Sequence, residues 1–199
     1  MGSESVDGKT HKRMTEEVAK SAEDVLEFWF AEGRKELWFN GGDDFDRLVE
    51  ATLGPLHRQA AMGALDDWAA TPRGALALVL LLDQVPRNIY RQTPQAYATD
   101  PQARRVAHEA VEAGRDRTLS QVERVFLYLP FEHSEDLDDQ ELCCRLMSDL
   151  DENPDWLDFA ERHRNLIARF GRFPHRNAIL GRPCTPEEDA YLAQPGAGF

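Results

Sequence analysis

Two short segments of the chain carry basic side chains but no acidic ones, in a pattern suited to holding an anion. Residues 84–99 and 170–182 contain no Asp or Glu, although the formal net charge of the chain is −13. Guanidinium groups present a rigid fork of donors to carboxylate or phosphate, and Asn adds a donor and an acceptor. These two segments, together with Asp83 just before the first of them, predict a pocket for a small anionic ligand. The predicted ligand-binding residues are Asp83, Arg87, Asn88, Arg172, Arg176 and Asn177.

Asp83 ends a run of apolar residues, 76–82, that is apolar on every side and is therefore expected to be buried. A buried carboxylate needs a partner, and the expected partner is Arg87 one turn on or Arg176 across the fold. A paired Asp stays ionised. The alternative is that the arginines only tie loops to the core, through acids such as Asp83 and Glu135, because buried arginines are nearly always paired.

A second pattern, His133-Ser134-Glu135, follows the apolar run 125–129 and Pro130. Histidine and glutamate two residues apart can be a general base with its orienting acid, a pair of metal ligands, or part of a helix cap formed by Ser134. All three interpretations stay open from the sequence. The predicted catalytic residues are His133, Glu135 and His175.

A metal-dependent hydrolase is an alternative, with a site drawn from a set of His and Glu side chains and oriented by Glu132 or Asp83. The spacing matches no standard metal motif. The zinc deaminase signature is also broken, because Glu187 stands where a second Cys should follow Cys184. We therefore expect no metal and no cofactor. The residues of the alternative metal set are His133, Glu135, His163 and His175.

Helical patterns run along the chain, and strand patterns are nearly absent. Apolar residues recur at helical spacing in residues 45–53 and 156–170. We expect about eight helices in an all-α fold. Capping boxes are expected at Ser21 with Asp24, Ser120 with Glu123, and Thr185 with Glu188. Helix ends are expected at Gly63, Gly114 and Gly171, and Pro86, Pro130 and Pro174 are expected to limit helices or turn the chain after them.

Composition excludes several classes of partner and location. The acidic balance argues against binding to DNA, RNA or anionic lipid through a general positive field. The longest apolar run, residues 75–82, is far below the roughly 18 residues that span a bilayer. The chain has three cysteines, and their spacing does not match that of a disulfide-stabilised domain. This fits a reducing compartment, so a cytoplasmic protein is expected. Residues 1–20 are expected to be a disordered or vector-derived tail, and 21–199 a single all-α domain.

Three longer strings resemble one bacterial family. They are LLDQVPRNIYR at 81–91, FLYLPFEHSE at 126–135 and FGRFPHRN at 170–177. In this order they are similar to the bacterial domain-of-unknown-function family 924, over residues 25–192. The resemblance implies an all-helical superhelical bundle of the tetratricopeptide-repeat type, and it implies no activity.

Three functions from different classes compete at this point. The favoured one is a pocket for a small anionic ligand, since the unusual residues are dense in short loops that a helical scaffold can aim inward. The second is a scaffold that grips an extended peptide, which leaves a protein partner open. The third is the metal-dependent hydrolase. Whether the three strings converge on one cleft discriminates among them.

Overall fold

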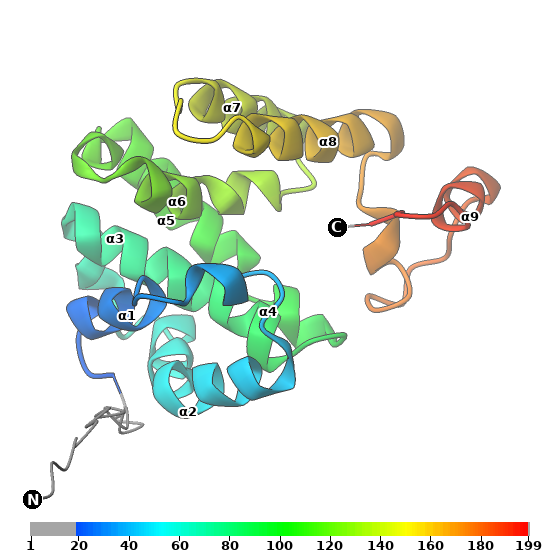
Figure 1. The fold of residues 1–199 in the computed structure, drawn as a ribbon. Coiled ribbons are helices and arrows are strands. Elements are labelled where there is room, and N and C mark those ends of the chain that lie inside the picture. The colour runs from blue at the N-terminus through cyan, green and yellow to red at the C-terminus, as the bar shows by residue number, and fades with distance from the viewer. Residues whose placement is uncertain (1–18, 199) are drawn as a thin grey trace, which may run out of the picture.

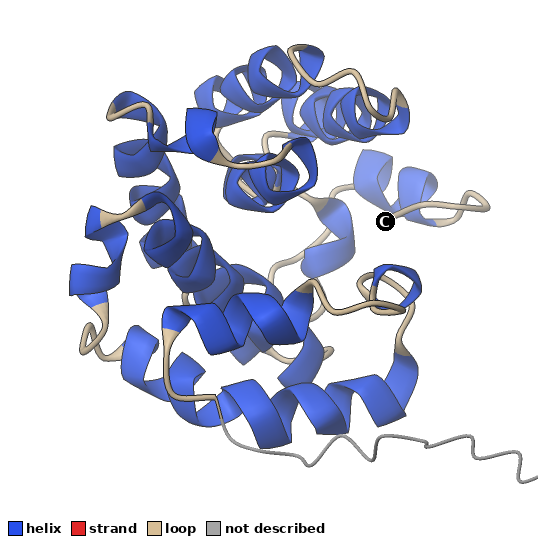
Figure 2. Ribbon diagram, turned by 60° about the vertical axis from the view of Figure 1, so that its left-hand side comes forward, coloured by secondary structure: helices blue, strands red, loops and turns tan. Residues whose placement is uncertain are grey.

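The computed structural model describes residues 19–198, and within this range every regular element is helical (Figures 1 and 2). The α-helices are α1 Ala22–Trp29, α2 Gly42–Ala61, α3 Pro72–Val79, α4 Val85–Ile89, α5 Asp100–Glu112, α6 Gln121–Glu132, α7 Leu137–Ser148, α8 Asp155–Phe170 and α9 Pro186–Leu192. The all-α prediction is confirmed. The expected tail falls almost wholly outside the described residues.

Helix starts and stops follow the sequence signals. All three predicted capping boxes are present, at Ser21, Ser120 and Thr185. The three glycines predicted at helix ends have left-handed φ angles of 77°, 66° and 68° at Gly63, Gly114 and Gly171. Only glycine adopts this backbone conformation without a steric cost, so the boundaries of these elements are set locally.

The centre of the molecule is one continuous helix formed by α3, the π-helical segment η3 (Leu80–Gln84) and α4. Its apolar residues 75–82 are all at most 1% exposed, and they belong to one hydrophobic cluster with residues of α1, α2, α5 and α6. Counting this helix once, the described part of the chain has the eight helices that the sequence predicts. A tetratricopeptide-type superhelix stays a prediction. No helix within residues 19–198 is long and apolar enough to cross a membrane.

Pro86 and Pro130 lie inside α4 and α6, so the prediction that they limit a helix was wrong at their own positions. Each helix ends shortly after its proline, at Ile89 and at Glu132. In η3 the Val85 amide donates to the Leu80 carbonyl five residues back. Because Val85 donates to Leu80 and Pro86 has no amide N–H, the Leu81 and Leu82 carbonyls lack the amide donor four residues on that an α-helix supplies. The Leu82 carbonyl accepts a hydrogen bond of 2.5 Å from the Thr99 hydroxyl, and the Leu81 carbonyl one of 2.7 Å from His57 Nδ1. Side chains therefore stabilise the widened turn that contains Asp83.

We expect Thr99→Val to cost about 1–3 kcal/mol of unfolding free energy, because it leaves the buried Leu82 carbonyl without a donor. The matched control is Thr118→Val, whose hydroxyl makes a comparable bond on the exposed surface, to Arg115. Urea unfolding of both variants measures the difference. Equal stability of the two would show that the bond at Leu82 does not support the π-helical segment.

Candidate functional site

Asp83 is a fully buried carboxylate held by three side chains. His133 Nδ1 lies 2.9 Å and 3.0 Å from its two oxygens, Gln84 Nε2 donates at 2.7 Å, and an Arg87 nitrogen lies at 3.1 Å. Burial alone would raise the pKa of Asp83, but Arg87 and His133 lower it well below its ordinary value. Asp83 is therefore ionised and is the acceptor at the centre of this cluster.

His133 directly follows α6, where α6 ends, and points its Nδ1 at Asp83. Its Nε2 makes no hydrogen bond to any residue in the described range, and 16% of the side chain is exposed. Burial and Arg87 lower the pKa of His133, although Asp83 acts in the opposite direction. At neutral pH the ring is therefore neutral, with its proton on the Nδ1 side and a lone pair on Nε2.

Arg87 and Asn88 hold α4 in place from the same short helix. Arg87 donates to both oxygens of Asp100, at 2.8 Å and 2.9 Å, and to the Asp83 carbonyl at 2.8 Å. Asn88 donates to the Gln84 carbonyl and accepts from Arg91. Most of the hydrogen-bonding capacity of both residues is used within the protein. Their role as ligand-binding residues stays a prediction.

Arg176 lies in the 3₁₀ turn Pro174–Arg176 and is the least satisfied cation of the cluster. It is 7% exposed, its guanidinium stacks on Phe173 at 4.4 Å and Tyr97 at 4.8 Å, and one terminal nitrogen donates to the His133 carbonyl at 3.0 Å. The nearest carboxylate oxygen, on Asp100, is 3.8 Å away. Burial and Arg87 lower the pKa of Arg176 to about 10. Arg176 still carries its charge at neutral pH.

One edge of the Arg176 guanidinium has no acceptor among residues 19–198. Its Nε is buried without a hydrogen bond, and the terminal nitrogen on the same edge makes none either. Nε and one terminal nitrogen of arginine together form a two-donor fork that matches the oxygens of a carboxylate or phosphate. This edge of Arg176 is therefore a two-donor fork without an acceptor in the described part of the chain.

Three further residues predicted to act on a ligand are paired inside the protein. Glu135 accepts from both terminal nitrogens of Arg182, at 2.7 Å and 2.9 Å, and from the Phe173 amide. Arg172 forms a two-bond pair with Glu188, at 2.6 Å and 2.7 Å, and Asn177 is fully buried between Glu188 and Arg182. These contacts fasten the segment around α9 to α6, as the structural alternative expects. Their assignment to a site stays untested.

The other two histidines of the cluster lie around the Phe173 ring. Its centroid is 5.6 Å from His163 and 5.5 Å from His175, and His133 is 6.4 Å from His163. His163 Nδ1 donates to the Phe159 carbonyl at 2.8 Å. Burial lowers the pKa of His163 to about 3 and that of His175 to about 4. All three imidazoles are therefore neutral at pH 7.

The alternative metal set does not form a cluster of ligands. No group of three or more His, Cys, Asp or Glu side chains in the described chain is placed to hold a metal ion. His133 directs Nδ1 at Asp83, and Glu135 is taken by Arg182. The hydrolase alternative thus has no supporting geometry in residues 19–198.

Glu132 is a feature of the site that the sequence analysis treated only as a residue that orients others. It is 6% exposed and has no Lys or Arg partner in the described structure. His163 Nδ1 lies 3.5 Å from one Glu132 oxygen but donates to the Phe159 carbonyl. Burial and Asp83 raise the pKa of Glu132 to about 8, so it is protonated at neutral pH. Its position in α6, which is apolar on all sides here, was the available signal.

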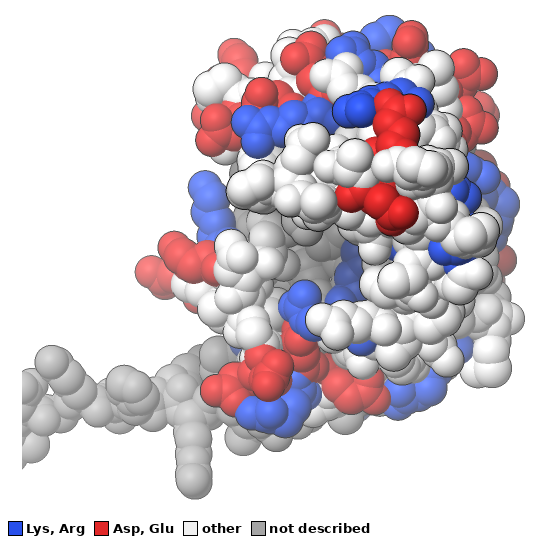
Figure 3. Space-filling model, turned by 90° about the vertical axis from the view of Figure 1, so that its right-hand side faces the viewer, with Lys and Arg blue, Asp and Glu red and all other residues white. Residues whose placement is uncertain are grey.

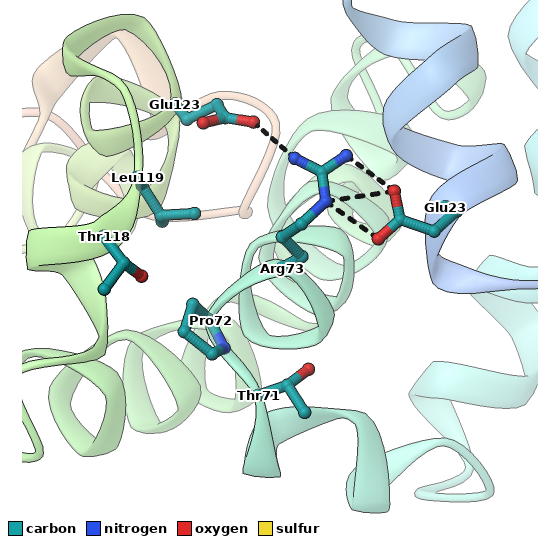
Figure 4. Close-up of a pocket in the computed structure, with 7 residues that line it drawn as sticks. All are labelled: Glu23, Thr71, Pro72, Arg73, Thr118, Leu119 and Glu123. Carbon is teal, nitrogen blue, oxygen red and sulfur yellow. Dashed lines mark hydrogen bonds and ion pairs between the residues drawn. The ribbon is translucent and has the colours of Figure 1, made fainter.

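The cluster lies where α4, the end of α6 and the turn before α9 meet. Figure 3 looks onto the side of the molecule that carries α4 and α9 in Figure 1, and this face is hollowed, with Lys or Arg side chains at the hollow. A separate surface depression of about 390 Å³ is lined by residues of α1, α3 and α6 (Figure 4). There Arg73 donates to both Glu23 and Glu123, so its charge is already neutralised.

Comparisons with known proteins give a family and a similar structure. The family model described as "Bacterial protein of unknown function (DUF924)" matches residues 25–196. A solved structure of a protein of unknown function from Agrobacterium tumefaciens is 45% identical, with a TM-score of 0.83, and the match covers 87% of this chain and 97% of that one. The comparison with curated proteins found no match. The chain therefore belongs to the bacterial DUF924 family, as its three sequence strings indicate.

Proposed function

We propose that this protein binds a small carboxylate- or phosphate-bearing molecule at the free edge of Arg176, with His133 as a general base beside it. The observation that carries the proposal is the buried Arg176 Nε without an acceptor, next to an Asp83–His133 pair whose Nε2 is unused. The partner in this proposal is a small molecule, and neither a nucleic acid nor a membrane is needed.

The energetics favour an absent acceptor over a purely structural arginine. A buried donor without an acceptor costs about 1–3 kcal/mol, and more on a charged group. Arg87, Arg172 and Arg182 in the same region each make at least two charge-assisted hydrogen bonds to a carboxylate. An anion at the open edge of Arg176 would remove this cost, and the Tyr97 and Phe173 rings already hold the guanidinium in place.

The neighbouring pair supplies the chemistry. Asp83 fixes the His133 ring and its tautomer, and it stabilises the imidazolium that forms when Nε2 takes a proton. A neutral imidazole with a free lone pair at pH 7 can remove a proton from a bound ligand or from a water molecule. The supported reaction class is therefore proton transfer, or hydrolysis by an activated water, on an anionic substrate.

The three family strings support an enclosed site over a peptide scaffold. Asp83 comes from the first string, His133 from the second and Arg176 from the third, and all three are within one contact network. Exposed ridges along helices, which a peptide scaffold needs, would not require buried and partly unsatisfied polar groups of this kind.

Thermal melts with succinate, sulfate or phosphate at fixed ionic strength test the proposal. A ligand at one hundred times its Kd adds about 2.7 kcal/mol, which raises Tm by roughly 5–10 °C in a domain of this size. We expect Arg176→Gln to abolish this rise without lowering the Tm of the protein in its absence.

The matched control is Arg172→Gln, which removes an arginine from the same segment but breaks an internal ion pair with Glu188. It should lower the starting Tm and keep the ligand-induced rise. If wild type shows no rise beyond that given by chloride, or if Arg176→Gln keeps the rise, the proposed site is wrong.

A further inference from the structure

Arg34 is a second buried arginine without an anionic partner, in the loop between α1 and α2. It is 6% exposed, and its guanidinium makes no hydrogen bond or ion pair with the part of the chain that the structure describes. It directly follows Gly33, whose φ of 78° only glycine adopts readily. The left-handed backbone at Gly33 thus turns the chain immediately before Arg34.

The surroundings of Arg34 are aromatic. Its guanidinium lies 4.4 Å from the centre of the Phe28 ring and 5.6 Å from that of Phe45. One terminal nitrogen is buried and has no acceptor. The Trp29 indole also packs against Phe45, at 6.2 Å, and its Nε1 is likewise buried without an acceptor. Aromatic faces attract the charge but accept no strong hydrogen bond, so these donors stay unsatisfied.

Two acidic residues in the first turns of α2, which follows the Arg34 loop, pair with other arginines. Asp44 contacts Arg47, and Asp46 contacts Arg91 on α4. Burial lowers the pKa of Arg34 without any acid to oppose it. A buried cation that is left unpaired in a chain with an excess of acids is costly, unless a ligand supplies the anion.

We propose that Arg34 is the cation of a second anion subsite, which takes a carboxylate or phosphate oxygen from a ligand. It is formed by the α1–α2 loop and the Phe28 and Phe45 rings, and it shares no residue with the Asp83–His133–Arg176 cluster. It therefore stands independently of the proposed function. The Phe28 and Phe45 rings beside the guanidinium favour a ligand that places a flat or apolar part next to its anionic group.

The Trp29 indole packs against Phe45, one of the two rings beside Arg34, so its N–H is a reporter for this subsite. We expect titration with sulfate, and separately with acetate, to shift the Trp29 Nε1–H and Arg34 Nε–H resonances in ¹⁵N NMR spectra of the full chain. Sulfate represents phosphate oxygens, and acetate represents carboxylates. The shifts should be lost in Arg34→Met and kept in Arg176→Gln. Arg34→Met should melt at the wild-type Tm or above it without anion, because it removes an unpaired buried charge.

Two results would overturn the subsite. One is that neither resonance moves in wild type at saturating sulfate or acetate. The other is that Arg34→Met lowers Tm by several degrees without anion, which would make Arg34 a packing residue held by Phe28. Arg176→Gln separates this test from the proposed function, since loss of the Arg176 response alone leaves the Arg34 response unchanged.

Discussion

Asp83→Asn should destabilise the protein by about 3–5 kcal/mol at pH 7, among the largest effects expected of a single side chain here. The substitution leaves the half-buried Arg87 with Asp100 as its one carboxylate partner and turns the His133 N–H toward a neutral amide. Removing the fully buried member of such an ion pair has a cost of this size. In a chain of this length the loss corresponds to a fall in Tm of roughly 6–20 °C. Urea unfolding at pH 7 measures it.

The control is Asp158→Asn, which removes an acid that pairs with Arg162 on the exposed surface of α8. An exposed pair one helical turn apart contributes about 0.3–0.5 kcal/mol. If Asp83→Asn costs no more than this control, Asp83 does not hold the network together as its contacts indicate.

Glu132→Gln should stabilise the protein in a way that depends on pH. The folded state raises the pKa of Glu132 to about 8, above an ordinary value of 4.5. This contribution to stability is therefore full below pH 4.5 and is lost as the pH rises through 8. The Gln variant has no proton to lose. Its advantage over wild type should grow between pH 4.5 and 8 and reach on the order of 5 kcal/mol above pH 8.

Urea unfolding at pH 5, 7 and 9 checks this dependence. Glu161→Gln, which removes an exposed carboxylate on α8, is the matched control and should show no such growth. A constant difference between Glu132→Gln and wild type across this range would mean that Glu132 is ionised in the folded protein. Burial and Asp83 would then raise the pKa of Glu132 far less than stated above.

The helices were predictable because their signals are local. Capping boxes at Ser120 and Thr185 and a left-handed glycine at Gly171 depend only on residues one turn apart. The π-helical turn was not predictable, because it is stabilised by His57 of α2 and by Thr99 just before α5, both distant in the sequence. Pro86 was misread for the same reason.

Some contacts of the candidate site were likewise predictable from the sequence, and others were not. Burial of Asp83 and its pairing with Arg87 follow from an apolar run and one helical turn. The contact between Asp83 and His133 joins residues 50 positions apart, so no spacing indicates it. The acid-free segment after α8 suggested free arginines, but Glu188 and Glu135 reach Arg172 and Arg182 from outside it. Charge patterns along the chain cannot show such long-range pairing.

The central claim is that the open edge of Arg176 receives an anion beside His133. The most direct measurement is the ¹⁵N NMR signal of the Arg176 Nε–H, assigned with Arg176→Lys, during titration with succinate at constant ionic strength. We predict a saturable shift of this signal, together with a change at the His133 imidazole nitrogens, and no change at Arg172 Nε. An unchanged Arg176 signal at saturating succinate, sulfate and phosphate would contradict the account.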